Sequence, residues 1–130
     1  MSPTEENKPR ILLIDNEAIA LSNMSHVLEK EGYEVTACKD GESGLREMQH
    51  KMFDLVLTDL RMPGVDGMQV LQHVKETTPD LPVIMITGYA SLDSAVEAMK
   101  RGAYHYIAKP FRLDEAREIV RGALDYGRLK

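Results

Sequence analysis

Residues 55–59 read Leu-Val-Leu-Thr-Asp, a short apolar segment that ends in a carboxylate. Short apolar runs rich in β-branched residues are typical of buried strands. Three other segments share this pattern, because each leads into a reactive polar side chain: residues 11–14 before Asp15, residues 83–86 before Thr87, and residues 106–108 before Lys109. If these strands are parallel neighbours, the four polar side chains open onto one edge of one sheet, which is where open α/β folds bind ligands.

Strand and helix patterns alternate five times along the chain, which predicts an α/β fold with five parallel strands and five helices on both faces of the sheet. The first, third and fourth strands are apolar throughout, as strands covered on both faces should be. The second strand (residues 33–38) and the fifth are mixed, as edge strands often are. The order 2-1-3-4-5 satisfies both this pattern and right-handed crossover. It places Asp15 opposite Asp59, at the point where the winding reverses.

Local signals predict where the helices begin and end. Gly32 and Gly102 follow helical patterns, and each is predicted to adopt the left-handed backbone conformation that ends a helix. Asp40 predicts an N-terminal cap for the second helix. Residues 62–67, Met-Pro-Gly-Val-Asp-Gly, cannot form a regular helix. The last helix is predicted over residues 113–129.

Length and composition fit one globular domain and exclude several classes of protein. The 130 residues are 43% apolar and 28% charged, which is close to the average for folded domains. A net charge of −5 argues against a nucleic-acid-binding role, and no apolar run is long enough to span a membrane. The single cysteine, Cys38, cannot form an internal disulfide, and residues 1–9 lack the apolar core of a signal peptide, so a cytoplasmic location is expected.

The four strand-end groups suit a metal-assisted phosphoryl site. Asp15 and Asp59 would repel each other unless a cation joins them or one takes up a proton, and Mg²⁺ is a hard ion that prefers such oxygen ligands. Lys109 would act as a point charge for a phosphoryl oxygen, and the Thr87 hydroxyl would donate to another. Because Pro110 follows Lys109 in a strand-end turn, the bond between them is a candidate cis peptide, which would aim the lysine inward. A lone aspartate after a strand is more often a turn residue or a helix cap, so the prediction depends on all four groups together.

These motifs together resemble the receiver domain of bacterial two-component response regulators. The resemblance runs from Arg10 to about Gly127 and is carried by these pieces, in this order: Ile14-Asp15-Asn16-Glu17, Thr58-Asp59-Leu60-Arg61-Met62-Pro63-Gly64 with Asp66-Gly67, Ile86-Thr87-Gly88 and Lys109-Pro110-Phe111. The stretch from Gly88 to Tyr104 is similar to receivers of the nitrogen-regulation (NtrC-like) class of transcription activators. The resemblance implies a flavodoxin-like (CheY-like) fold. It implies a flexible segment over residues 1–9, a receiver domain over residues 10–127, and in residues 128–130 the end of the domain or the beginning of a linker.

The resemblance also implies a role for each matching residue. Asp59 would accept a phosphoryl group in a Mg²⁺-dependent reaction. The cation would be held by Asp15, Asn16, Asp59 and the backbone carbonyl of Arg61. The phosphoryl oxygens would be held by the side chains of Lys109 and Thr87 and by the backbone amides of Arg61 and Gly88. Thr87 and Tyr106 would be the switch residues. Such a domain phosphorylates and dephosphorylates itself but is not an enzyme in the ordinary sense.

The partners that the resemblance implies are those of a signalling switch. The phosphoryl donor would be a sensor histidine kinase, and a covalently linked output domain would follow the last helix and control transcription. A homodimer would form through the fourth helix, the fifth strand and the fifth helix. No direct contact of this domain with nucleic acid or with a membrane is expected.

One position departs from the family's pattern. Two acidic residues normally end the first strand, but the second residue here is Asn16, an uncharged ligand. We therefore expect weaker Mg²⁺ binding than in a two-acid receiver. Glu17 follows and is a candidate to compensate for the missing acid, although its side chain, at the start of a helix, is expected to point elsewhere. Arg61 and Tyr89 are expected to flank the path of water to phosphorylated Asp59 and so to lengthen the lifetime of the phosphorylated state.

Other classes of function remain open at this stage. Asn16 makes a degenerate receiver plausible, one that acts as a protein interaction module without phosphate. A Mg²⁺-dependent phosphohydrolase commonly has an acid two residues beyond its nucleophile, but that position holds Arg61. A flavin-binding role is disfavoured, because the loop after Ile14 has no glycine- or serine-rich phosphate cradle.

Overall fold

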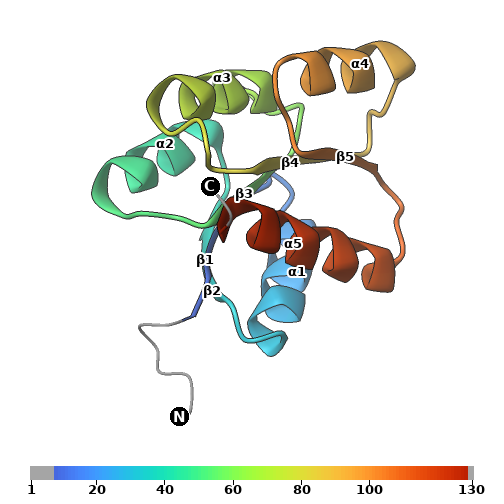
Figure 1. Ribbon diagram of the computed structural model, residues 1–130. Helices are drawn as coiled ribbons and strands as arrows, with labels where there is room; N and C mark the ends of the chain where they lie inside the picture. Colours follow the sequence, from blue (N-terminus) through green and yellow to red (C-terminus); the bar gives the residue numbers. More distant parts are fainter. Residues whose placement is uncertain (1–7, 129–130) are drawn as a thin grey trace.

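The central element of the computed structural model is a parallel sheet in the predicted order, β2-β1-β3-β4-β5 (Figure 1). The structure describes residues 8–128, so the expected flexible segment over residues 1–9 lies largely outside the described residues, as do residues 129 and 130. The strands are β1 (Arg10–Ile14), β2 (Glu34–Cys38), β3 (Leu55–Thr58), β4 (Val83–Thr87) and β5 (His105–Ala108). All four neighbouring pairs are parallel.

The helices cover both faces of the sheet, as strict alternation predicts. Their bounds are α1 (Ala18–Lys30), α2 (Gly41–His50), α3 (Gly67–Thr77), α4 (Leu92–Lys100) and α5 (Leu113–Arg128). Helices α1 and α5 pack on one face, and α2, α3 and α4 on the other (Figure 1). Within residues 8–128, no helix has both the length and the apolar character that a membrane span requires.

Each buried strand contributes alternate side chains to two hydrophobic clusters, because successive residues of a strand point to opposite faces. In β1, Leu12 and Ile14 belong to the cluster beneath α2, α3 and α4, whereas Ile11 and Leu13 belong to the cluster beneath α1 and α5. All residues of β3 and β4 are buried, while β2 and β5 are mixed. The pattern of apolar and mixed strands therefore predicted the central and edge positions correctly.

The predicted helix boundaries are largely confirmed. Gly32 and Gly102 have φ angles of 94° and 100°, so both adopt the left-handed conformation that stops a helix. The Asp40 carboxylate accepts a hydrogen bond from the Ser43 amide and caps α2. Helix α3 begins at Gly67, after a capping box between Asp66 and Gln69. The chain between Asp59 and Gly67 is therefore a loop, and this loop borders the carboxyl edge of the sheet.

Candidate functional site

The side chains that follow β1, β3 and β5 meet at the carboxyl edge of the sheet. Lys109 Nζ donates a hydrogen bond to Asp15 Oδ2 at 2.9 Å and lies 3.6 Å from Asp59 Oδ2. Strand register causes this meeting, because Ile14 of β1 is paired with Thr58 of β3 and each strand ends one residue before its aspartate. The predicted convergence of these three groups is therefore confirmed by the geometry.

Thr87, the fourth predicted group, ends β4 and is fully buried. Its Oγ1 accepts a hydrogen bond from the Tyr89 amide at 3.0 Å. Its carbonyl oxygen accepts the Lys109 amide at 2.8 Å, which ties the ends of β4 and β5 together. The hydroxyl proton of Thr87 remains available for a further acceptor, since a hydroxyl both donates and accepts.

Asp59 is a buried carboxylate, with 5% of its surface exposed. Its Oδ1 accepts the Arg61 amide at 3.3 Å, and its own amide donates to the Ile14 carbonyl at 2.9 Å. Burial raises the pKa of Asp59 above its ordinary value, and the charge of Asp15 adds to this, while Lys109 and the backbone hydrogen bonds oppose it. An anionic oxygen with low solvation beside a cation is a reasonable nucleophile, because little water must be removed before it reacts.

Lys109 is held among carboxylates by the turn after β5. The Lys109–Pro110 peptide bond, a candidate for the cis form, is cis. Burial is the largest single influence on the pKa of Lys109 and lowers it, but the hydrogen bond to Asp15 and the charges of Asp15, Asp59 and Glu17 together raise it above its ordinary value. The side chain is therefore a fixed positive charge at neutral pH.

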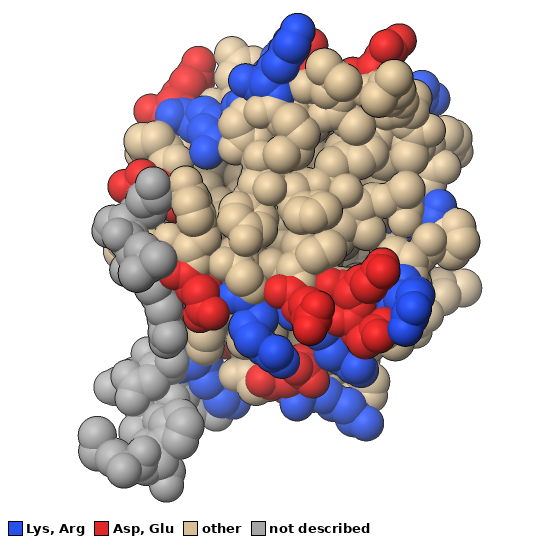
Figure 2. Space-filling model, turned by 45° about the vertical axis from the view of Figure 1, so that its right-hand side comes forward, with Lys and Arg blue, Asp and Glu red and all other residues tan. Residues whose placement is uncertain are grey.

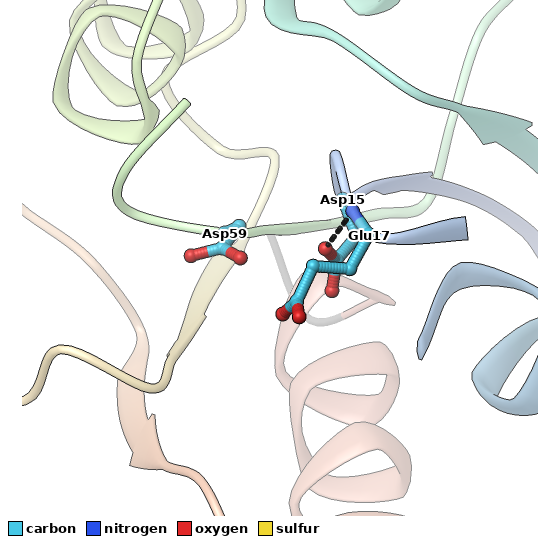
Figure 3. A group of neighbouring side chains, drawn as sticks. All are labelled: Asp15, Glu17 and Asp59. Carbon is cyan, nitrogen blue, oxygen red and sulfur yellow. Dashed lines mark hydrogen bonds between the residues drawn. The ribbon is translucent and has the colours of Figure 1, made fainter. Parts of the chain in front are cut away.

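The expectation that Glu17 points elsewhere is wrong. Its Oε1 lies 3.5 Å from Lys109 Nζ, and its carboxylate faces the same space as those of Asp15 and Asp59 (Figure 3). The physical reason is that Glu17 is the N-cap of α1 and has extended backbone angles, φ −95° and ψ 113°, so its side chain leaves the chain before the first helical turn. The uncharged Asn16 beside it was the reason to consider Glu17 as a compensating acid, but the side-chain direction expected for Glu17 was not the one observed.

The donors at this edge fit a divalent cation. Asp15, Glu17 and Asp59 each offer a carboxylate oxygen, and these three atoms lie within 4.8 Å of one another (Figure 3). Carboxylate oxygens are hard ligands of the kind that Mg²⁺ prefers. Asn16 and Arg61 line the same cleft as Glu17 and Asp59. A bound cation of this kind would neutralise negative charge on an incoming phosphoryl group.

A cleft of about 960 Å³ opens beside Asp59, between the loop after β3 and the start of α4. Arg61 and Tyr89 both line it, and the Arg61 guanidinium carbon lies 4.9 Å from the centre of the Tyr89 ring. This distance is within the range of cation–π attraction. The two side chains therefore meet in the cleft beside Asp59, where the sequence led us to expect them.

Tyr106, on β5, is half-buried and packs against the core beneath α3 and α4. Its hydroxyl is hydrogen-bonded to Ser94 Oγ, at 2.6 Å. Ser94 lies in the first turn of α4, where its amide donates to the Ser91 side chain that caps the helix. Sequence reasoning singled out Tyr106 but missed Ser94, since a serine at this spacing carries no signal of its own.

Comparisons with known proteins agree with this geometry. A family model described as the response regulator receiver domain matches residues 11–121. The "Transcriptional regulatory protein ZraR" of Klebsiella oxytoca is 37% identical over 119 residues, which cover 92% of this chain and 27% of that protein. The "DNA-binding transcriptional regulator NtrC" of Escherichia coli (strain K12) is 34% identical over 116 residues, covering 89% of this chain and 25% of that protein. The chain thus spans about a quarter of the length of these relatives.

Solved structures give the same result for the fold. A response regulator receiver domain protein from Clostridium thermocellum has a TM-score of 0.88 and 36% identity, covering 93% of this chain and 98% of that chain. NtrX from Brucella abortus has a TM-score of 0.88 and 33% identity, covering 94% of this chain and 28% of that chain. By its family model, its relatives and its fold, the chain belongs to the response regulator receiver domains, and its relatives include regulators of the NtrC-like class.

Proposed function

We propose that this domain is a phosphorylation-dependent switch in which Asp59 accepts a phosphoryl group from a sensor histidine kinase. The observation that supports this most is the placement of one buried carboxylate, Asp59, within 3.6 Å of the Lys109 ammonium and among the carboxylates of Asp15 and Glu17. An Oδ of Asp59 forms a bond to phosphorus while the bond from phosphorus to the donor's imidazole nitrogen breaks. The electron pair of that bond leaves with the imidazole, and the product is an acyl phosphate.

The residues around Asp59 bind the phosphoryl oxygens and the cation. Lys109 neutralises a phosphoryl oxygen, the Thr87 hydroxyl donates to a second, and the backbone amides of Arg61 and Gly88 hold the others. Mg²⁺ would be held by Asp15, Asn16, Asp59 and the backbone carbonyl of Arg61, and it would neutralise charge on the phosphoryl group. Each of these groups stabilises charge that grows at the phosphoryl oxygens, which is the main way in which proteins accelerate phosphoryl transfer.

The switch follows from the change in charge at Asp59. Phosphorylation replaces about one negative charge by nearly two and adds strong hydrogen-bond acceptors. Reversing a population of 1:99 requires about 5.5 kcal/mol of differential binding, and charge-assisted hydrogen bonds contribute roughly 1.5–3 kcal/mol each.

When Thr87 turns toward the phosphoryl group, its bond to the Tyr89 amide is lost, and the segment that leads into α4 is released. Tyr106, bound to Ser94 at the start of α4, responds to the same movement.

The output surface is formed by α4, β5 and α5. Several apolar side chains are exposed on its helices: Leu92, Val96, Met99, Leu113 and Tyr126. Figure 2 shows a broad area without charged side chains above a row of acidic and basic groups. A second copy of the chain packs against this surface to form a homodimer, and a covalently linked output domain receives the signal and controls transcription. The partial coverage of the longer ZraR and NtrC relatives supports such a linked domain.

A phosphohydrolase activity is disfavoured by the same geometry. Such an enzyme would need an acid or base two residues beyond Asp59. Arg61 occupies that position, and its guanidinium lies over the Tyr89 ring. No general base is therefore placed there to activate water.

The proposal is tested by incubating the protein with acetyl phosphate and Mg²⁺ and measuring its intact mass. The expected result is an increase of one phosphoryl group in the wild type that is absent in Asp59→Asn. Asp54→Asn is the matched control, because Asp54 precedes β3 at the opposite end of the strand, where it accepts a hydrogen bond from the Arg10 amide. A wild type without an adduct would favour the phosphate-independent interaction module.

A further inference from the structure

Glu17 takes part in the charge balance of the site, although it was not assigned a role there. Its carboxylate is one of three that share a single ammonium: Lys109 Nζ lies 2.9 Å from Asp15, 3.5 Å from Glu17 and 3.6 Å from Asp59. Three carboxylates and one ammonium leave two negative charges, the charge that one divalent cation balances. Without Glu17, only one negative charge would remain, since Asn16 contributes none.

The backbone directs Glu17 into the site. The Asp15 Oδ1 atom accepts the Glu17 amide at 2.9 Å, which folds the chain back at the end of β1. The Glu17 carbonyl accepts the Leu21 amide at 2.9 Å and so begins α1. The Glu17 side chain makes no capping hydrogen bond to the backbone of α1, so its carboxylate can bind another group.

The distances are close to those that a cation requires. Mg²⁺ binds oxygen at about 2.1 Å in octahedral geometry, so opposite ligands lie roughly 4.2 Å apart. The three carboxylate oxygens lie within 4.8 Å of one another, so small side-chain rotations bring them together. The Glu17 side chain is 69% exposed, and exposed ion pairs contribute little free energy. Glu17 can therefore leave Lys109 at little cost.

We infer that Glu17 is a direct ligand of the divalent cation and supplies the negative charge that Asn16 lacks. The inference rests on the proposed function, because it concerns the cation of the same site. It changes the expected consequence of Asn16: the second acidic ligand has moved one residue along the chain, and the affinity for metal is retained.

The test is direct measurement of Mn²⁺ binding by electron paramagnetic resonance, without any phosphoryl donor, followed by displacement with Mg²⁺. Glu17→Gln is expected to weaken Mn²⁺ binding about tenfold or more. Glu17→Asp, which keeps the charge but shortens the side chain, is expected to weaken it as well, which a long-range effect of charge would not do. Asn16→Asp in the Glu17→Gln background is expected to restore the affinity. Glu118→Gln, an exposed glutamate of α5, is the control for net charge and should bind Mn²⁺ as the wild type does.

Two results would overturn the inference. If Glu17→Gln binds Mn²⁺ as tightly as the wild type, Glu17 is not a ligand, and a wild type that still gains a phosphoryl group at Asp59 would leave the proposed function intact. If Glu17→Asp binds Mn²⁺ as the wild type does while Glu17→Gln does not, Glu17 acts through the electric field of its negative charge and is not a ligand. A wild type that neither binds Mn²⁺ nor accepts a phosphoryl group would remove both proposals.

Discussion

Lys109 and Asp15 are 94 residues apart in the chain, yet Lys109 Nζ donates a 2.9 Å hydrogen bond to Asp15 Oδ2. The contact joins the end of β5 to the end of β1, across the two strands that lie between them. The same ammonium lies 3.6 Å from Asp59, so the positive charge of Lys109 holds two buried aspartates close together. Like charges at such distances are stable only with a cation between them or with a proton on one of them.

Replacement of Lys109 by methionine is expected to separate two effects that the lysine combines. Metal binding should become tighter, because a positive charge that repels a divalent cation is removed. Phosphoryl uptake should become slower, by about a hundredfold, because a group that stabilises the developing charge is lost. Mn²⁺ binding and the rate of adduct formation with acetyl phosphate measure the two effects. Lys30→Met, at an exposed position of α1, is the control; weaker metal binding in Lys109→Met would contradict this explanation.

The stability of the protein should depend on the ionisation of Asp59. Because burial raises the pKa of this carboxyl in the folded protein, its ionisation at neutral pH destabilises the fold. Without metal, Asp59→Asn is expected to raise the free energy of unfolding at neutral pH, because the buried charge is removed. The difference should shrink as the pH falls and vanish below the ordinary aspartate pKa of 3.8. Urea unfolding in a chelator over this pH range provides the measurement, and equal stability of the two proteins at neutral pH would count against the raised pKa.

The contact between Arg61 and Tyr89 should protect the phosphorylated state. The guanidinium lies 4.9 Å from the ring centre, and both residues line the cleft beside Asp59, so we expect the pair to hinder the approach of water. The Arg61→Ala/Tyr89→Ala double variant is expected to lose its phosphoryl group several-fold faster, as measured by intact mass after acetyl phosphate is removed. Tyr89→Phe keeps the ring and should decay at the wild-type rate. An unchanged lifetime in the double alanine variant would show that the pair does not exclude water.

The hydrogen bond between Tyr106 and Ser94 should couple β5 to the start of α4. A buried or half-buried hydrogen bond contributes about 1 kcal/mol, so Tyr106→Phe and Ser94→Ala should together cost less than the sum of their separate effects. A double-mutant cycle on the free energy of unfolding measures this coupling. Strictly additive losses would mean that the 2.6 Å contact does not join the two elements in solution.

Gly67 should tolerate no side chain, because a Cβ atom there would clash with the Asp59 carbonyl oxygen and lie 2.9 Å from the Leu60 Cα. Both are backbone atoms and cannot rotate away. Gly67→Ala is expected to lower the free energy of unfolding by about 2–3 kcal/mol. Gly88→Ala is the matched control, since no atom of the described chain lies within 4 Å of a Cβ at that position. Its effect on stability should be within about 0.5 kcal/mol, and a similar loss in both variants would refute the steric argument.

Much of the fold could be predicted from the sequence because buried strands consist mainly of apolar residues. Strands β1, β3 and β4 are buried almost throughout because helices cover both of their faces, and this pattern together with right-handed crossover gives the strand order. The convergence of Asp15, Asp59 and Lys109 then follows from parallel strands that end at a common edge. The bond before Pro110 was a candidate for the cis form because of its strand-end position, although most X-Pro bonds are trans.

The details that were missed depend on backbone angles and side-chain packing that composition does not record. Glu17 faces the site because its backbone is extended, and the sequence shows only that a helix begins nearby. Ser94 meets Tyr106 because α4 lies beside β5 with a particular rotation, which no periodicity specifies. The close packing of Gly67 on the Asp59 carbonyl depends in the same way on the path of one loop.

The most direct test of the central claim is a crystal structure of the protein with Mg²⁺ and beryllofluoride, a mimic of the phosphoryl group. We predict that the beryllium atom is bonded to an Oδ of Asp59, with Lys109 Nζ and Thr87 Oγ1 in hydrogen-bond contact with its fluorides and the cation bound by Asp15 and Asp59. A structure in which the mimic is bound elsewhere, or in which these side chains turn away from it, would contradict the account.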